Sequence, residues 1–450
     1  MLKPKHKTVL FIIFFVFINV PSVFAQSSGD QSVFEDHAAG VVWKFKSSNP
    51  IAVFTPADRE NFHMMNFPDE PVGVVRVGES KYFFFGPSNV VDITESVEKR
   101  GPSKLYKTRH QGTYKFEGTL DKISPVVDFE GKIFPSLKPG RLQPSPDGRN
   151  FDRDYAGGGS TYIIDINGKP VLVHLYHGEY HQDLFDDGKV HHKKFSSYAS
   201  AGIAIDPQSF GSQIGNHMMK LGEILSAHMG REDYFAKNNE GVLDSGTISW
   251  IEADRGGHHI NEEGKQEPYL YVMFGERNSW NEEDYGFGLA RALKKDVYAA
   301  IAAQKVPVFK KYYLPDGADS SKGNYFTEPA IGGRSTLLFN KISGGGYFAH
   351  PRLVYNSHIK LFMLSYMVNQ DTVYLRLSDD LIHWSNRIRI AENAGGFLNY
   401  PALVADEKSS SPVLLADHFY LYYVAGPKTG HILEDRKQVT FMRRDIEIVQ

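Results

Sequence analysis

Apolar side chains alternate with polar ones along most of the chain, in short runs bounded by Gly, Pro, Asn, Asp and Ser. Successive side chains of a β-strand point to opposite faces, so these runs predict half-buried strands. Five pairs of runs flank a turn and predict hairpins that open near residues 69, 154, 244, 350 and 400. The second hairpin has the clearest signal, because Asn167-Gly168 is favoured in type I′ turns.

The five hairpins recur at a coarse spacing, and each is followed by another β-like segment, such as "TVYLRLSDDLIHWS" after the fourth. This recurrence predicts an all-β fold, a five-bladed β-propeller with one blade for each hairpin. A β-sandwich is the alternative. In a propeller the chain ends lie near each other, so we expect the segment around residues 35 to 55 to complete or adjoin the last blade.

Helical periodicity is confined to residues 213–227 and 289–304, which we expect to form short helical insertions. No stretch has the composition of a linker between domains. Residues 26–450 are therefore expected to form a single catalytic domain.

The first 25 residues have the organisation of a signal peptide. Lys3, Lys5 and Lys7 precede an apolar core, and "VFA" before Gln26 resembles a cleavage site. We expect this segment to be removed and the protein to be secreted or periplasmic. No later apolar stretch approaches the length of a membrane span, so no membrane partner is expected.

Composition excludes several kinds of chemistry. The chain has no cysteine, which excludes disulfides, zinc-thiolate sites and thiol nucleophiles. A net charge of -3 gives no electrostatic basis for binding nucleic acid. Aromatic residues make up 13% of the chain, and such rings fill sheet cores or stack on sugars. We expect a monomer.

Three segments carry a resemblance to a known family. An acidic residue stands just before a predicted inner strand in "PDEPVGVVRVGESKYFFFGPS", and the other two segments are "LRLSDDLIHWS" and "TEPAIGGRS". In this order they resemble the five-bladed β-propeller glycoside hydrolases, which include arabinanases, β-xylosidases and fructan-cleaving enzymes. The resemblance covers roughly residues 60 to 448.

The resemblance implies a glycoside hydrolase, possibly acting on a furanosidic polysaccharide such as arabinan by an inverting mechanism. Such catalysis uses two carboxyl groups, one on each side of the scissile bond. The implied roles are a base on the first blade, an aspartate that tunes the acid, and a glutamate acid on a later blade. The candidate catalytic residues are Asp69 as base, Glu328 as acid, and Asp154 and Asp244 for the tuning role.

Each of these carboxylates also has a plain structural interpretation. Asp69 could form a turn, with Glu70 pointing the other way on an extended chain. Asp154 could form a salt bridge with Arg153, and Asp244 could close an Asx-turn.

Substrate-binding candidates follow the same strands. His177, Glu179 and His181 alternate, so a strand would place them on one face, where they could serve a sugar or a metal. The substrate-binding candidates are Glu179, His177, His350, Tyr400 and Arg334. The resemblance allows calcium near His350; otherwise no cofactor is expected.

Two other functions stay open. A carbohydrate-binding propeller without activity would show the same strands. A glycoside phosphorylase would need Arg and His beside the acids, for which Arg334 and Arg352 are candidates. Three carboxylates within reach of each other would favour an enzyme, whereas one carboxylate ringed by aromatics would favour a binder.

Overall fold

The structure is a computed structural model. It describes residues 31–36, 41–91, 109–181, 196–207, 213–236, 241–260, 266–279, 281–318, 325–340, 346–409, 411–428 and 437–449. The proposed signal peptide, residues 1–25, lies outside the described residues.

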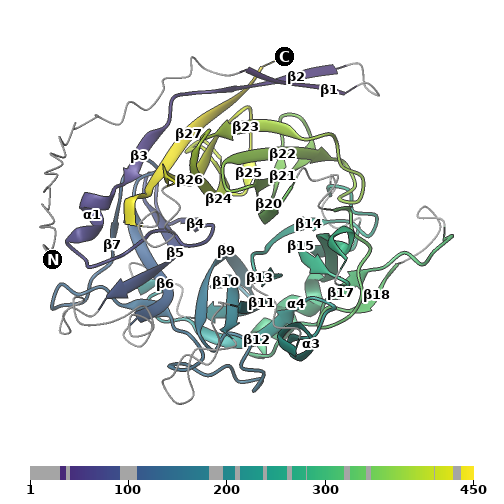
Figure 1. The fold of residues 1–450 in the computed structure, drawn as a ribbon, viewed down its shortest axis with the longest axis horizontal. Helices are drawn as coiled ribbons and strands as arrows, with labels where there is room; N and C mark the ends of the chain where they lie inside the picture. The colour runs from purple at the N-terminus through teal and green to yellow at the C-terminus, as the bar shows by residue number, and fades with distance from the viewer. Residues whose placement is uncertain are drawn as a thin grey trace, which may run out of the picture.

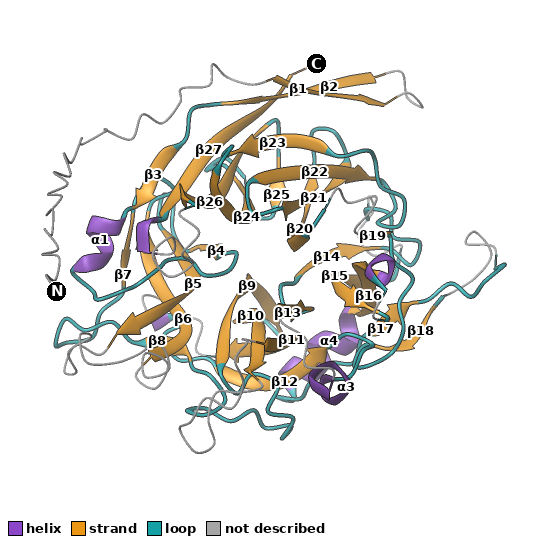
Figure 2. Cartoon of the chain, viewed as in Figure 1, coloured by secondary structure: helices purple, strands orange, loops and turns teal. Residues whose placement is uncertain are grey.

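The strands form five blades arranged in a ring around a central axis (Figures 1 and 2). Blades 1 and 2 are joined into one sheet by a single bridge between Gly112 and Ala156. The prediction of an all-β, five-bladed propeller is confirmed. In chain order, the innermost strands of the blades are β4 (Gly73–Arg76), β9 (Tyr155–Ile166), β14 (Ser249–Ala253), β20 (Phe348–Asn356) and β24 (Gly396–Ala405).

The other strands extend each blade away from the axis. Blade 1 adds β5 (Tyr82–Val91), β6 (Arg109–Gly118), β7 (Ile123–Pro125) and β8 (Pro135–Leu137). Blade 2 adds β10 (Lys169–His181), β11 (Ser196–Asp206), β12 (Met219–Leu225) and β13 (Gly241–Asp244). Blade 3 adds β15 (Tyr269–Arg277), β16 (Tyr285–Leu293), β17 (Lys310–Tyr312), β18 (Phe326–Pro329) and β19 (Phe339–Asn340).

Blades 4 and 5 complete the ring. Blade 4 adds β21 (Leu361–Val368), β22 (Thr372–Ser378), β23 (Ile388–Glu392) and β25 (Leu414–Leu415). Blade 5 adds β26 (His418–Pro427), β27 (Thr440–Val449), β1 (Gln31–Asp36), β2 (Val41–Ser47) and β3 (Ile51–Phe54).

The two ends of the described chain meet in blade 5. β2 pairs with β27 from Lys44 opposite Val449 to Ser47 opposite Ile446, and β3 also pairs with β27. The yellow C-terminal strand and the purple N-terminal strands lie side by side in Figure 1. The expectation that the N-terminal segment completes the last blade is confirmed.

All five predicted hairpins are present as β4–β5, β9–β10, β14–β15, β20–β21 and β24–β26. At the second turn, φ is 55° at Asn167 and 78° at Gly168. Positive φ at both central residues is what a type I′ turn requires, so the sequence signal identified this turn correctly.

Three short α-helices lie outside the sheets: α1 (Pro56–Glu60), α3 (Arg231–Ala236) and α4 (Lys294–Ala302), with a 3₁₀ turn η4 (Glu282–Asp284) among the described residues. The helix predicted at 289–304 is confirmed for α4, but its first residues complete β16. The helix predicted at 213–227 is wrong, because Met219–Leu225 pair with β11 as strand β12. Pairing with a neighbouring strand overrides a weak local period.

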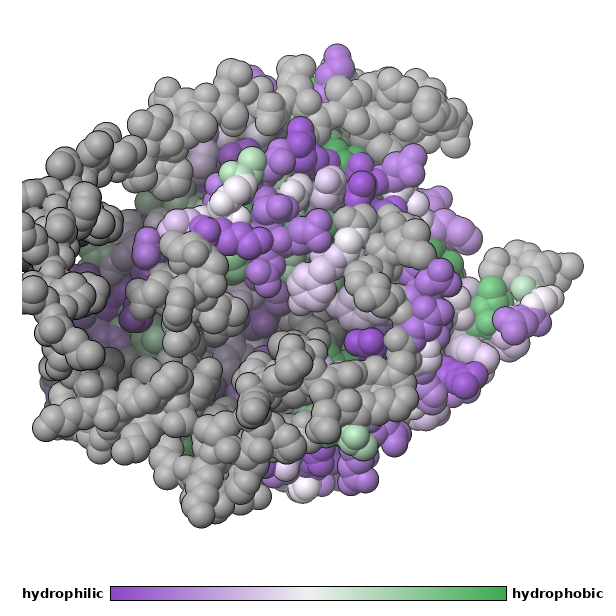
Figure 3. Space-filling model, viewed as in Figure 1, coloured by the Kyte–Doolittle hydropathy of each residue, from purple (hydrophilic) through white to green (hydrophobic). Residues whose placement is uncertain are grey.

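Apolar side chains form a separate buried cluster between each pair of neighbouring blades. Phe85 packs with Tyr176 between blades 1 and 2, for example, and Leu375 with Leu403 between blades 4 and 5. The remaining three interfaces are filled in the same way. The visible face of the described residues is mostly hydrophilic (Figure 3). One large apolar side chain, Phe129, is 97% exposed. The ring is thus held together by sheet-to-sheet packing around the axis.

No helix in the described residues is long and apolar enough to cross a membrane.

The closure of blade 5 can be tested by shortening the chain. A protein that begins at Thr55 lacks Phe45, Val53 and Phe54, which are all buried in the structure. Burial of each such side chain contributes about 1.5–3 kcal/mol. We expect this protein to melt at a much lower temperature than one that begins at Gln31, measured by circular dichroism. Equal melting temperatures would show that β2 and β3 do not close the ring.

Candidate active site

Side chains from all five blades meet where the inner strands begin. Tyr400 donates its hydroxyl to Asp69 Oδ1 over 3.2 Å, and Tyr155 donates its hydroxyl to the Asp69 carbonyl over 3.3 Å. Thr247 donates to Glu70 Oε2 over 2.8 Å, and His350 Nδ1 lies 2.9 Å from the same oxygen. Asp69 is 7% exposed and Glu70 6%. The axial cluster is defined as Asp69, Glu70, Tyr155, Thr247, His350 and Tyr400.

The backbone bulges at the two later blades to bring side chains into this cluster. His350 has φ of 61° and Tyr400 has φ of 59°, which is the left-handed region. The strand pairing shifts register between Ala349 and Arg352, and again between Asn399 and Ala402. A bulge re-aims a side chain, and positive φ at a non-glycine residue costs about 1–3 kcal/mol. Both residues precede a proline, as Glu70 does.

Glycines make room for the cluster at blades 2 and 3. A β-carbon on Gly158, whose φ is 71°, would lie 2.2 Å from the β-carbon of Glu70. A β-carbon on Gly246 would lie 2.4 Å from His177 Nδ1. Neither position can carry a side chain without displacing its neighbour. At these two positions, therefore, the entrances of blades 2 and 3 supply space for groups from elsewhere.

Glu179 lies on the second strand of blade 2, between two histidines. Its Oε1 lies 2.9 Å from His177 Nε2, and its Oε2 is hydrogen-bonded to His181 Nε2. Burial opposes ionisation of Glu179, but hydrogen bonds and charges from the two histidines outweigh it and hold the pKa well below its usual value. Glu179 is therefore an ionised carboxylate.

Tyr155 links Glu179 to the first blade. It is paired with Glu179 across β9 and β10. Burial raises the pKa of the Tyr155 phenol well above its usual value, and the charges of Asp69, Glu70 and Glu179 raise it further. The phenol is a hydrogen-bond donor throughout the working pH range. Three carboxylates thus lie within electrostatic reach of one hydroxyl group.

The structure brings five of the residues singled out from the sequence to the axis or beside it. Asp69, His350 and Tyr400 belong to the axial cluster. His177 adjoins it through Gly246, and Glu179 is hydrogen-bonded to His177. Asp69 lies in a bend of the chain, but its carboxylate is buried against Tyr400 and is not exposed to solvent as in an ordinary surface turn. Glu70, which was expected to point the other way, is also buried in the cluster.

Asp154 forms the salt bridge with Arg153 that was its plain structural interpretation. Its carboxylate lies 2.6 Å from Arg141 Nε and 2.8 Å from Arg153 Nε, and it accepts the His181 backbone N–H over 2.8 Å. These contacts hold the end of β10, which carries Glu179. The proposed role of Asp154 in tuning the acid stays a prediction.

The expectation that Asp244 opens the third blade is wrong. Asp244 is the last residue of β13, which pairs in parallel with β11 of blade 2, and its backbone lies opposite Ala199. The inner strand of blade 3 begins only at Ser249. Its catalytic role stays a prediction.

Glu328 and Arg334 lie away from the axial cluster, so their predicted places are corrected. Glu328 is in β18, the outermost strand of the path through blade 3, opposite Lys311. Arg334 is exposed in the following loop, where its Nε lies 3.4 Å from His228 Nε2. The "TEPAIGGRS" motif was expected to mark the inner strand of a later blade. Blade 3 instead has extra outer strands, and the motif lies in and after one of them, β18.

Sequence reasoning missed Glu70, Tyr155 and Thr247 as members of the cluster. A signal for Glu70 was present, because it precedes Pro71 as His350 precedes Pro351 and Tyr400 precedes Pro401. Tyr155 and Thr247 have no comparable signal. Their roles depend on how the blades face each other across the axis.

Among the described residues, no group of three or more His, Asp or Glu is arranged so that it could hold a metal ion. His350 Nδ1 is engaged with Glu70, and both carboxylate oxygens of Glu179 are engaged with histidines. Calcium near His350 stays a prediction, and no catalytic step is assigned to it.

No family model matches the sequence, and no curated protein matches it. Solved structures resemble it over most of their length. A GH62 hydrolase in complex with xylotriose is 9% identical, with 89% of this chain and 96% of that chain covered and a TM-score of 0.44. An α-L-arabinofuranosidase from Lactobacillus brevis is 10% identical, with 85% and 91% covered and a TM-score of 0.42. At this low sequence identity the similarity is one of fold alone. The function therefore has to be inferred from the side chains of this protein.

The fit between Gly158 and Glu70 gives a test of the cluster. In Gly158→Ala the new methyl group displaces Glu70, so we expect a large loss of any activity or ligand binding at this site. Gly148→Ala is the matched control, because Gly148 has a similar φ of 70° but nothing within 4 Å. Both proteins would be assayed at a temperature where circular dichroism shows them folded. Equal behaviour would mean that the position of Glu70 is unimportant.

The lowered pKa of Glu179 gives a test by pH. In the unfolded chain the pKa of a glutamate side chain is about 4.3, and above that pH the ionised Glu179 carboxylate stabilises the fold. This contribution is lost as the pH falls towards the lower pKa that Glu179 has in the folded protein. We expect Glu179→Gln to be less stable than the wild type at pH 7, and the gap to narrow below about pH 4.3. Urea titrations at several pH values measure this gap. Exposed Glu130→Gln should show little difference at any pH, and a Glu179→Gln gap that is constant with pH would contradict the assignment.

Proposed function

We propose that this protein is an exported glycoside hydrolase that cleaves a polysaccharide or oligosaccharide by carboxylate acid/base catalysis. The observation that carries the proposal is the burial of two carboxylates, Asp69 and Glu70, in the axial cluster, where hydroxyl groups of Tyr400 and Thr247 hold them. Hydrolysis of a glycosidic bond uses two carboxyl groups. The sequence motifs favour a furanosidic substrate of the arabinan type.

Asp69 and Glu70 are the two catalytic carboxyl groups in this proposal. Asp69 is the base, oriented by the Tyr400 hydroxyl. Glu70 is the proton donor. Thr247 donates to its Oε2, which leaves Oε1 to carry the proton towards the leaving oxygen. His350 Nδ1 also lies against Oε2, so both of these partners of the Glu70 carboxyl engage the same oxygen.

Glu179 is a positioning residue in this proposal. Its low pKa keeps it ionised, so it cannot serve as the proton donor. It orients the His177 ring, which lies against Gly246 at the entrance of blade 3. His177 and His350 then face the substrate from two sides of the axis.

A carbohydrate-binding propeller without activity is the second candidate. The buried rings of Tyr155 and Tyr400 beside the carboxylates are compatible with binding alone. The number of carboxylates favours the enzyme. A phosphorylase has less support, because Arg334 is exposed at the rim of blade 3 and no described carboxylate pairs with Arg352.

Hydrolysis of a panel of arabinans, xylans, fructans and mannans tests the proposal, with released reducing sugar as the readout. On the substrate found, Asp69→Asn and Glu70→Gln should each lower kcat by orders of magnitude and change KM little, because each removes a group that acts in the transition state. Glu328→Gln is the matched control and should keep wild-type activity, since Glu328 lies at the rim.

The outcomes separate the two candidates. Binding to one of these glycans without any release of sugar would establish the binding protein instead. Near-normal turnover in Asp69→Asn or Glu70→Gln would remove that residue from the catalytic pair.

A further inference from the structure

Arg352 is a buried cation that crosses the axis. It lies on β20 of blade 4 and is 2% exposed. Its Nη1 donates to the Gly159 carbonyl over 3.3 Å and to the Ser160 hydroxyl, both on β9 of blade 2. Its Nε is buried and has no hydrogen-bond partner in the described part of the chain.

Arg352 also lacks a counter-charge. None of the described carboxylates pairs with it, and the only group whose charge favours its ionised form is the Tyr162 phenol. Burial lowers the pKa of the guanidinium for this reason. An isolated buried charge is strongly unfavourable unless it is paired and hydrogen-bonded. A guanidinium remains protonated in proteins, so the charge has to be balanced by another means.

The neighbouring groups define the kind of ligand that could balance it. Burial and the charge of Arg352 lower the pKa of His174 to about 3, so His174 is neutral at working pH. The His174 ring contacts the Thr161 hydroxyl at 2.8 Å. The surroundings therefore hold one positive charge and several neutral polar groups. A single positive charge repels metal cations and matches a monovalent anion.

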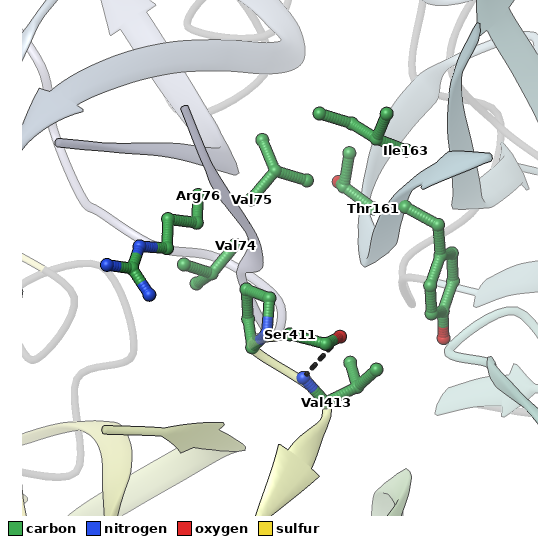
Figure 4. Close-up of a pocket in the computed structure, with 9 residues that line it drawn as sticks. Val74, Val75, Arg76, Thr161, Ile163, Ser411 and Val413 are labelled. Atoms are coloured by element: carbon green, nitrogen blue, oxygen red, sulfur yellow. Dashed lines mark hydrogen bonds between the residues drawn. The ribbon is translucent and has the colours of Figure 1, made fainter. Parts of the chain in front are cut away.

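A cavity lies next to this region, farther along β4 and β9 from the axial cluster. It has a volume of about 220 Å³ and is lined in part by Thr161 and Tyr162, the partners of His174 and Arg352. Figure 4 shows Thr161 and Ile163 facing Val75 and Ser411 across it.

We infer that Arg352 forms, with its unpartnered Nε, a buried binding site for a monovalent inorganic anion of the chloride class. The anion would bridge the guanidinium of blade 4 and the polar groups of blade 2, and so fasten the two blades across the axis. The site is separate from the proposed catalytic residues and does not depend on their assignment.

Diffraction from wild-type crystals grown with bromide in place of chloride tests this site directly. We expect an anomalous peak at hydrogen-bonding distance from Arg352 Nε. A well-ordered map with only water at that position, or with nothing there, would overturn the proposal. This readout requires no substitution and therefore no variant that might fail to fold.

Thermal unfolding provides a second, independent readout. At constant ionic strength, replacing gluconate with bromide should raise the melting temperature of the wild type by a few degrees in a saturable way, because the anion binds only the folded state. Arg352→Met should lose this dependence. Arg376→Met is the matched control, since Arg376 is also buried in blade 4 but bonds to Tyr366 and Ser385, and it should keep the dependence. An equal bromide effect in Arg352→Met would count against the site.

Discussion

One carboxylate oxygen, Oε2 of Glu70, connects three blades at the axis. It accepts the Thr247 hydroxyl of blade 3 and lies against His350 of blade 4, while its own chain belongs to blade 1. A buried carboxylate without such donors would be strongly destabilising, so these contacts fix how the three blades face each other. Gly158 of blade 2 adds a steric limit, because its backbone lies directly against the Glu70 side chain. The position of this one group therefore depends on four of the blades.

The fold could be predicted because each blade begins with a hairpin, and the sequence signals for a hairpin lie within a few neighbouring residues. The turn at Asn167-Gly168 and the alternation on either side of it are contained within a few residues, and they fix a hairpin without reference to the rest of the chain. The segment 213–227 could not be predicted in this way. Its apolar positions fit a weak helical period, and only the presence of β11 beside it makes β12 a strand. Long-range pairing is the information that the local pattern lacks.

The candidate site could be predicted only in part, for the same reason. Asp69, His350 and Tyr400 stand at strand entrances, which the hairpin pattern locates. Glu328 has a similar local sequence, yet blade 3 continues outward to β18 and leaves it at the rim. Gly158 and Gly246 carry no chemical group that would mark them as site residues in the sequence, although they create the space that Glu70 and His177 occupy. Which group fills an empty position across the axis depends on the assembled ring.

The strained residues at blades 4 and 5 argue that the cluster serves a function beyond stability. Glycine adopts positive φ at no steric cost, and blade 2 uses it at Gly158. His350 and Tyr400 adopt the same conformation at a cost of about 1–3 kcal/mol each. A chain selected only for stability would place glycine there too. The two side chains are retained where they contact Glu70 and Asp69, the pair of buried carboxylates at the axis. Among the described non-glycine residues with positive φ, His350 and Tyr400 are the two that lie within strands, and strain at the partners of two carboxylates is what a site built to control those carboxylates requires.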